Sequence, residues 1–235
     1  MLKQGFLLPF SSSLWENCPV EKIVEIIVIL EKRYGIPENN HPRDPLTELV
    51  FTILSQNTTD INRDRAFKRL TSQFPSWGAA LDAPLPGIED AIRVGGLGAQ
   101  KSRRIKEILF DIKREHGSLS LEFLRELNPV EAKERLLSFK GVGHKTASIV
   151  LLFSLGMPAF PVDTHIYRVS RRLGLVPERL SEKRSHELLE KIVPAEKYYS
   201  FHRNLISLGK ELCKPKKPKC HLCPLEGICA FAMKP

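Results

Sequence analysis

Apolar side chains recur along this chain with the period of amphipathic helices, and no segment alternates as a half-buried strand would. The first helical group covers residues 23–30, and Gly35 and Pro37 behind it predict a helix stop. A second group covers residues 46–54 and leads into a polar run at residues 55–60, which we therefore expect near a helix C-terminus. Because these patterns dominate, we predict an all-α fold.

Further helices are expected at short intervals along the chain. They are predicted over roughly residues 60–74, 88–94, 101–115, 120–127, 145–155 and 166–173, with another ending near Phe139. Gly95, Gly96 and Gly98 predict an irregular loop ahead of the helix that begins around Ala99. The longest mainly apolar run, residues 147–155, is too short to cross a bilayer, so we expect no membrane span.

The charge of the chain favours a polyanionic partner. Its 36 Lys and Arg residues outnumber 27 Asp and Glu residues, which gives a net charge of +9 and suits nucleic acid. Charge alone does not decide this, because many basic soluble proteins bind no nucleic acid.

The two ends of the chain differ in their cysteine content. Residues 1–18 hold a short apolar stretch interrupted by Pro9, which we interpret as a tail packed on the body. Four of the five cysteines lie in the last 23 residues, a distribution that does not fit a disulfide framework spread through a secreted domain. We expect a cytoplasmic protein, associated with the nucleoid if prokaryotic, in which Cys18 is a packed thiol.

The segment FKGVGHKTA, residues 139–147, places a glycine-rich turn between two helical patterns. Gly141 and Gly143 permit positive φ angles and leave backbone N–H groups uncovered at the start of the second helix, where they can bind a phosphate. Lys140 and Lys145 add positive charge to the turn. Ordinary helix connections also use glycines, so the turn alone leaves both interpretations open.

Eighteen positions after Lys145, the segment PVDTH sets Asp163 just ahead of a helical pattern. An amine after a glycine-rich turn and a carboxylate before a helix can together attack and stabilise an electrophilic sugar carbon. Asp163 also fits an N-cap that accepts backbone N–H bonds, and the two roles can coexist. Without its context, Lys145 would be interpreted as a solvated surface charge.

Cys213, Cys220, Cys223 and Cys229 have six, two and five residues between them, with prolines interleaved. Four thiolates this close can fold around a metal centre. Disulfides are one alternative. Structural zinc is another, although sites of four cysteines usually pair two C-x-x-C knuckles and only Cys220 with Cys223 forms one here. The four lysines between the first two cysteines form a basic loop suited to a DNA backbone.

FKGVGHKTA followed by PVDTH resembles the helix-hairpin-helix and Gly/Pro-Asp signature of the endonuclease III superfamily of DNA glycosylases. The resemblance covers nearly the whole chain, from Glu21 to Cys229, and the cysteine spacing is similar to the 4Fe-4S loop of the endonuclease III family. It implies a 4Fe-4S cluster held by the four cysteines. It also implies an enzyme, because the lysine of the GVGxKTA segment marks the bifunctional glycosylase/lyases of the superfamily.

The resemblance implies a reaction for these residues. Lys145 would attack C1′ of a damaged nucleotide, displace the base and form a Schiff base, after which β-elimination cuts the strand on the 3′ side. Asp163 would stabilise the oxocarbenium-like sugar. The turn departs from the family's frequent Leu-Pro-Gly-Val-Gly by having Phe139 and Lys140, which should leave the turn intact and add a phosphate contact.

An enzyme that acts on a base in a duplex must flip the nucleotide out and fill the gap. By resemblance, the segment ILSQNTTD carries the gap-filling side chain, which alignment places on Asn57, with Gln56 as the alternative. Leu97 in the GGLG loop would be an apolar wedge. The residues alone equally fit a helix C-cap for Gln56 and Asn57 and a buried loop anchor for Leu97.

The resemblance also implies two lobes. A six-helix barrel would span residues 37–157, and residues 1–36 with 158–235 would form the cluster lobe, with DNA across the cleft. We expect a monomer that acts on damaged bases, foremost oxidised pyrimidines, or on abasic sites in double-stranded DNA. Two alternatives stay open. One is a sister glycosylase that removes uracil, mismatched thymine or adenine, although Lys145 argues against the adenine-specific type. The other is a noncatalytic iron-sulfur DNA-binding module.

Overall fold

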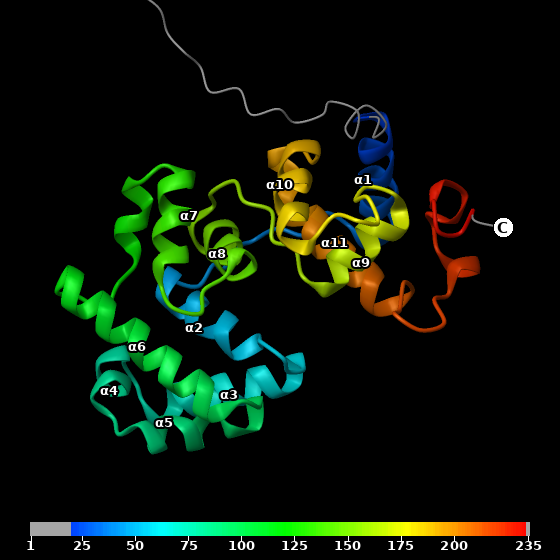
Figure 1. Ribbon diagram of the computed structural model, residues 1–235. Coiled ribbons are helices and arrows are strands. Elements are labelled where there is room, and N and C mark those ends of the chain that lie inside the picture. Colours follow the sequence, from blue (N-terminus) through cyan, green and yellow to red (C-terminus); the bar gives the residue numbers. More distant parts are fainter. Residues whose placement is uncertain (1–19, 234–235) are drawn as a thin grey trace, which may run out of the picture.

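The structure is a computed structural model that describes residues 20–233. Within this range every regular element is helical, which confirms the all-α prediction (Figure 1). None of these helices is long and apolar enough to span a membrane. The expected N-terminal tail and Cys18 lie outside the described residues.

Eleven α-helices follow one another along the described residues. They are α1 (Val20–Tyr34), α2 (Pro45–Ser55), α3 (Asp60–Gln73), α4 (Trp77–Asp82), α5 (Leu85–Ile92), α6 (Gly98–His116), α7 (Pro129–Ser138), α8 (His144–Val150), α9 (Thr164–Leu173), α10 (Glu182–Ile192) and α11 (Tyr198–Glu211). The helices expected from periodicity at residues 23–30, 46–54 and 60–74 correspond to the first three.

One helix expected from the sequence has a different form. The segment at residues 120–127 contains a 3₁₀-helix, η3 (Glu122–Glu126), rather than an α-helix. Its two buried leucines, Leu121 and Leu124, are three residues apart, which matches the three-residue turn of a 3₁₀-helix. Pro129 then disfavours helical geometry at the residue before it, so the segment ends before an α-helix can develop.

Two hydrophobic cores organise the helices. The first, which we call the α2–α8 core, draws its buried side chains from residues 46–159. The second, the terminal core, combines α1 with α9, α10, α11 and the cysteine-rich C-terminal segment. Figure 1 shows α1, in blue, beside α11, although the two helices lie far apart in the sequence.

A π-helical turn, η4 (Leu151–Leu155), continues α8 and joins the two cores. Leu151 and Leu155 are buried in the α2–α8 core, whereas Leu152 is buried in the terminal core. The side chain of Asn39 donates a hydrogen bond to the carbonyl of Phe153 at 2.6 Å. The connection between the two cores is therefore packed on both sides.

Residues 159–162, which lead from this turn toward α9, are buried, and side chains of the terminal core hold their backbone. The ring of His186, on α10, donates from Nδ1 to the Phe160 carbonyl at 3.1 Å. The ring of His202, on α11, donates from Nδ1 to the next carbonyl, that of Pro161, at 3.0 Å. Glu190 accepts the Phe160 N–H at 3.1 Å. Burial lowers the pKa of each of these two histidines to about 4, so both rings are neutral at neutral pH.

We expect the stability of His202→Asn to fall less steeply than that of the native protein as the pH is lowered. The asparagine amide can still donate toward the Pro161 carbonyl, but it does not titrate. In the native protein the folded-state pKa of His202, about 4, lies below its ordinary value of 6.5. The unfolded chain therefore binds protons first, and stability is lost as the pH falls from the higher value to the lower, by about 1.4 kcal/mol per unit of pKa difference. Melting temperatures across this pH range measure the effect.

The matched control is His41→Asn, because His41 is exposed. The melting temperature of His41→Asn should fall with decreasing pH as steeply as that of the native protein. An unchanged acid slope in His202→Asn would contradict a buried, neutral His202.

Candidate functional site

The glycine-rich turn forms a hairpin between α7 and α8. Phe139 and Val142 are buried and anchor it, while Lys140, Gly141 and Gly143 are exposed. Gly141 has a φ of +83°, which favours glycine. Gly143 has a φ of −102°, so only Gly141 adopts the positive φ that both glycines permit. Open space surrounds the β-carbon position of Gly143, so a ligand can approach its backbone closely.

Arg104, on α6, lies directly over Gly141. A β-carbon built on Gly141 would stand 2.0 Å from Nε of Arg104, so only glycine leaves room for this guanidinium. Nη1 of the same arginine donates to Oε1 of Gln56 at 2.5 Å. Nε2 of Gln56 donates in turn to the hydroxyl of Thr146 at 3.5 Å, in the first turn of α8. Sequence reasoning placed Arg104 on a helix but missed this link between the hairpin and the end of α2.

The two candidate gap-filling residues therefore differ in their surroundings. Gln56 is half-buried and bonded to Arg104 and Thr146. Asn57 is exposed and has a φ of +51°, a left-handed conformation that asparagine tolerates better than most residues. The C-cap interpretation applies to Gln56, whose N–H bonds to the Ile53 carbonyl. Asn57 is the residue whose side chain is free to meet a ligand.

Leu97 belongs to the loop that approaches Asn57. It is 48% exposed, so it is not the buried anchor considered as an alternative. Its φ of +52° is also left-handed, and it immediately precedes α6. A β-carbon on the preceding Gly96 would stand 3.9 Å from the Asn57 carbonyl. The structure thus brings the two loop tips together.

Lys145 and Asp163 both lie near the buried His202. Asp163 caps α9, since its Oδ1 accepts the Ile166 N–H at 2.8 Å, and the N-cap expectation is confirmed. Lys145 lies half-buried in the first turn of α8. Burial dominates the low pKa of His202; the Asp163 carboxylate raises that pKa and the Lys145 ammonium lowers it. The structure therefore places a cation and an anion around the same imidazole, both partly open to solvent.

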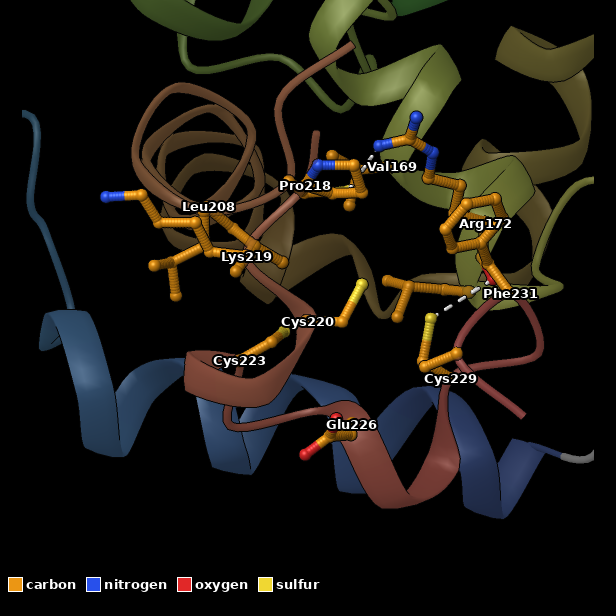
Figure 2. A pocket seen from close by; sticks show the side chains of 14 residues that line it. Val169, Arg172, Leu208, Pro218, Lys219, Cys220, Cys223, Glu226, Cys229 and Phe231 are labelled. Carbon is orange, nitrogen blue, oxygen red and sulfur yellow. Dashed lines mark hydrogen bonds between the residues drawn. The ribbon is translucent and has the colours of Figure 1, made fainter. Parts of the chain in front are cut away.

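The four C-terminal cysteines line one cavity, which is closed by apolar side chains of α9, α11 and the C-terminal segment. Figure 2 shows the sulfur atoms of Cys220 and Cys229 turned into it. All four thiols are free, with no disulfide among them. Burial and then the neighbouring thiols of Cys229 and Cys213 raise the pKa of Cys220. Four cysteines that line one mostly apolar cavity are a suitable donor set for a metal–sulfur cluster, whose positive metal ions would stabilise the thiolates.

Two arginines of α9 hold the loop that begins at Cys213. Arg172 donates to the carbonyls of Lys214 at 2.7 Å and Pro215 at 3.0 Å, and its Nη1 also lies 3.4 Å from Sγ of Cys213. Arg168 donates to the carbonyl of Cys213 at 3.0 Å. These residues were missed, although the run of basic residues after PVDTH was visible in the sequence.

Sequence comparison agrees with this geometry. The chain matches HhH-GPD superfamily base excision DNA repair proteins over residues 50–195. It also matches the iron-sulfur binding domain of endonuclease III over residues 213–229. Endonuclease III of Thermotoga maritima is 34% identical over 212 residues, which are 90% of this chain and 92% of that protein. The chain belongs to the endonuclease III family. As a member of this family it is a base excision DNA glycosylase with an iron-sulfur site.

Two plant proteins are similar to this chain over part of their length. An Arabidopsis thaliana protein provisionally named DNA glycosylase At3g47830 is 42% identical over 192 residues, and the match spans 66% of that protein, just under two thirds. DNA glycosylase/AP lyase ROS1, also of Arabidopsis thaliana, is 35% identical over 178 residues, which are 13% of its length.

Solved structures show the same fold. A trapped endonuclease III–DNA covalent intermediate superposes with a TM-score of 0.79 at 29% identity, over 91% of this chain and 97% of that one. A thermostable thymine-DNA glycosylase superposes with a TM-score of 0.77 at 24% identity, which shows a shared fold.

We expect Gly141→Ala to destabilise the hairpin. An alanine would meet Arg104 and would hold a left-handed backbone, and a strained position of this kind costs on the order of 1–3 kcal/mol. Chemical denaturation measures the loss in the free energy of unfolding. Gly143→Ala is the control: with an ordinary φ and open space it should cost less than about 0.5 kcal/mol. Equal losses in the two variants would contradict the close approach of Arg104.

Proposed function

We propose that this endonuclease III family member is a bifunctional enzyme, a DNA glycosylase with AP lyase activity, in which Lys145 is the nucleophile. The observation that carries the proposal is the placement of Lys145 and Asp163 around one buried imidazole, on the helix after the hairpin and at the cap of α9. The name of the related DNA glycosylase/AP lyase ROS1 supports it, as does the covalent DNA intermediate of an endonuclease III.

The proposed reaction begins at the sugar of a flipped nucleotide. The neutral amine of Lys145 forms a bond to C1′ while the bond from C1′ to the base breaks, and the base leaves with the electron pair and takes up a proton. The sugar ring then opens to a protonated Schiff base. Loss of a proton from C2′ expels the 3′ phosphate, and water releases the lysine from the product.

Asp163 would stabilise the positive charge that develops on the sugar. Its Oδ1 is engaged in the cap of α9, which holds the carboxylate in place, and a carboxylate offers a second oxygen to the reacting sugar. A fixed anion beside a developing cation contributes without reorganisation during the reaction. Capping and charge stabilisation are thus compatible in one residue.

DNA would be gripped at the hairpin and opened by the loop tips. Lys140 with the exposed backbone of Gly141 and Gly143 would contact phosphates, which requires no base recognition. Asn57 would fill the gap left by the flipped nucleotide, and Leu97 would wedge beside it. Gln56, which is hydrogen-bonded to Arg104, would hold the backbone immediately before Asn57 in place. The barrel and cluster lobes predicted from the sequence correspond in this proposal to the two sides of the DNA-binding cleft.

Oxidised pyrimidines in duplex DNA are the leading substrate in this proposal. It rests on the likeness to endonuclease III along nearly the whole chain. The second candidate function is a glycosylase with a different base preference. The 42% identity to the plant glycosylase favours this candidate. Release of bases from a panel of duplexes that carry thymine glycol, uracil, mismatched thymine or adenine separates the two.

Cys213, Cys220, Cys223 and Cys229 would hold a 4Fe-4S cluster in the cavity that they line. Such a cluster, when bound, supplies a rigid cross-link of its segment and an electron-transfer centre. The base excision chemistry is assigned to Lys145 and Asp163 and takes no step through the cluster. The basic loop after Cys213, held by Arg172, would contact the DNA backbone.

Borohydride trapping tests the role of the lysine. The native protein is expected to form a covalent adduct with duplexes that hold an abasic site or thymine glycol, because reduction fixes the Schiff base. Lys145→Gln should form none, and Asp163→Asn should bind DNA but lose most turnover. Lys140→Gln, in the exposed part of the same hairpin, should still be trapped at saturating enzyme.

The outcomes are distinct. An adduct that persists in Lys145→Gln assigns the nucleophile to another amine. Trapping only on the abasic duplex supports the lyase with a different base preference. DNA binding without any adduct in the native protein overturns the bifunctional reaction.

Metal analysis tests the cluster. Purified protein should contain iron and acid-labile sulfide in equal amounts and show the visible absorption of an iron-sulfur chromophore, and Cys220→Ser should lose both. Leu222→Ser, an exposed position between two of the ligands, should retain them. Zinc in place of iron would refute the cluster assignment.

A further inference from the structure

Lys101, in the second turn of α6, is a buried lysine that none of the proposed chemistry uses. Its relative exposure is 1%, and it is among the largest fully buried side chains of the described chain. Lysine is almost never buried without a partner, because an ammonium loses several kcal/mol of hydration. Burial, and less strongly the charge of Arg104, lowers the pKa of Lys101 to about 8, so the ammonium form still prevails at neutral pH.

The ammonium of Lys101 has two backbone partners on different elements. Nζ donates to the carbonyl of Leu54 at 2.8 Å and to the carbonyl of Gly95 at 2.8 Å. Leu54 lies in the last turn of α2, where helix carbonyls lack intrahelical partners and carry partial negative charge. Gly95 ends the 3₁₀-helix η2 (Arg93–Gly95). A single cation therefore bridges the C-terminal ends of two helices.

These two helix ends are the bases of the two loop tips. Asn57 follows Leu54 by three residues, and Leu97 follows Gly95 by two. Both tips have left-handed backbones, at +51° and +52°. Left-handed geometry is strained for a non-glycine residue, and it persists only where the surroundings hold it.

We infer that Lys101 is a positioning residue, which clamps the loops of Asn57 and Leu97 to each other so that both tips enter the duplex as one rigid unit. The inference rests on the proposed function, in which these tips open the DNA. Flipping a nucleotide costs a few kcal/mol of stacking and pairing, and tips that are already ordered do not add their own ordering entropy to that cost. Lys101 itself, fully buried, touches no DNA.

The test uses Lys101→Met in the full-length protein and a probe that needs no base removal. The probe is a duplex with 2-aminopurine beside a tetrahydrofuran abasic analogue, in which the fluorescence rises when the tips unstack the reporter. The native protein should raise the fluorescence. Lys101→Met should lose most of this rise, and its rate of base release from a thymine glycol duplex should fall on the order of ten-fold to a hundred-fold. Its strand cleavage at a preformed abasic site should change far less.

Three further variants separate positioning from a general loss of structure. Lys106→Met is the matched control, because Lys106 lies on the same helix and donates to the Ala83 carbonyl, away from both tips; it should behave as the native protein. Lys101→Arg should restore the fluorescence, since a guanidinium can donate to two carbonyls. If Lys101→Met does not fold, Lys101→Gln, a shorter and uncharged donor, should show a partial loss.

A double-mutant cycle gives the decisive outcome. In an Asn57→Ala/Leu97→Ala background, Lys101→Met should cause no further loss, because the lysine acts through the tips. A full and additive loss in that background, or a normal fluorescence rise in Lys101→Met alone, would overturn the inference. If the native protein binds the probe without any rise, the proposed DNA-opening role of the tips fails instead.

Discussion

The relation between Lys145 and Asp163 depends on two neutral imidazoles that bond to consecutive backbone carbonyls. His186 and His202 come from different helices of the terminal core. They donate to the carbonyls of Phe160 and Pro161, which lie shortly before Asp163 in the chain. Their burial suppresses protonation, so the bonds persist without a charge in the interior. The position of the Asp163 carboxylate is thus set by the backbone of the preceding residues. Its hydrogen bond to the Ile166 N–H in α9 sets its orientation.

Basic side chains in this member of the endonuclease III family serve the protein interior as well as a polyanion outside it. Lys101 joins two helix ends, Arg104 joins α6 to the hairpin, and Arg172 holds the loop after Cys213. Each donates to backbone or amide oxygens of another element of the protein. The net charge of +9 consequently overstates the charge available to DNA, and the surface contribution comes from fewer residues such as Lys140.

Periodicity predicted most of the longer helices, because their apolar faces repeat over several turns, but no predicted helix covered α10 or α11. It also failed where elements were short. The six-residue α4 presents too few turns for a pattern, and η3 follows a three-residue repeat. Motif spacing located Lys145, Asp163 and the cysteines. It could not distinguish Gln56 from Asn57 or identify Lys101. Gln56 bonds to Arg104 and Thr146, and Lys101 bonds to Leu54, and each of these partners lies 47 or more residues away. The close approach of Arg104 to Gly141 is likewise a contact that no local pattern reveals.

The terminal core has a consequence for the order in which the chain folds. The helices of the α2–α8 core follow one another directly, so this core can form while synthesis continues. The helix α1 leaves the ribosome before them but finds α11 only after more than 160 further residues have been made. Its apolar face must stay unpaired, or shielded by a chaperone, during that time. Insertion of iron and sulfide into the cysteine cavity therefore has to wait until residues 213–229 have been translated, well after the helices of the α2–α8 core.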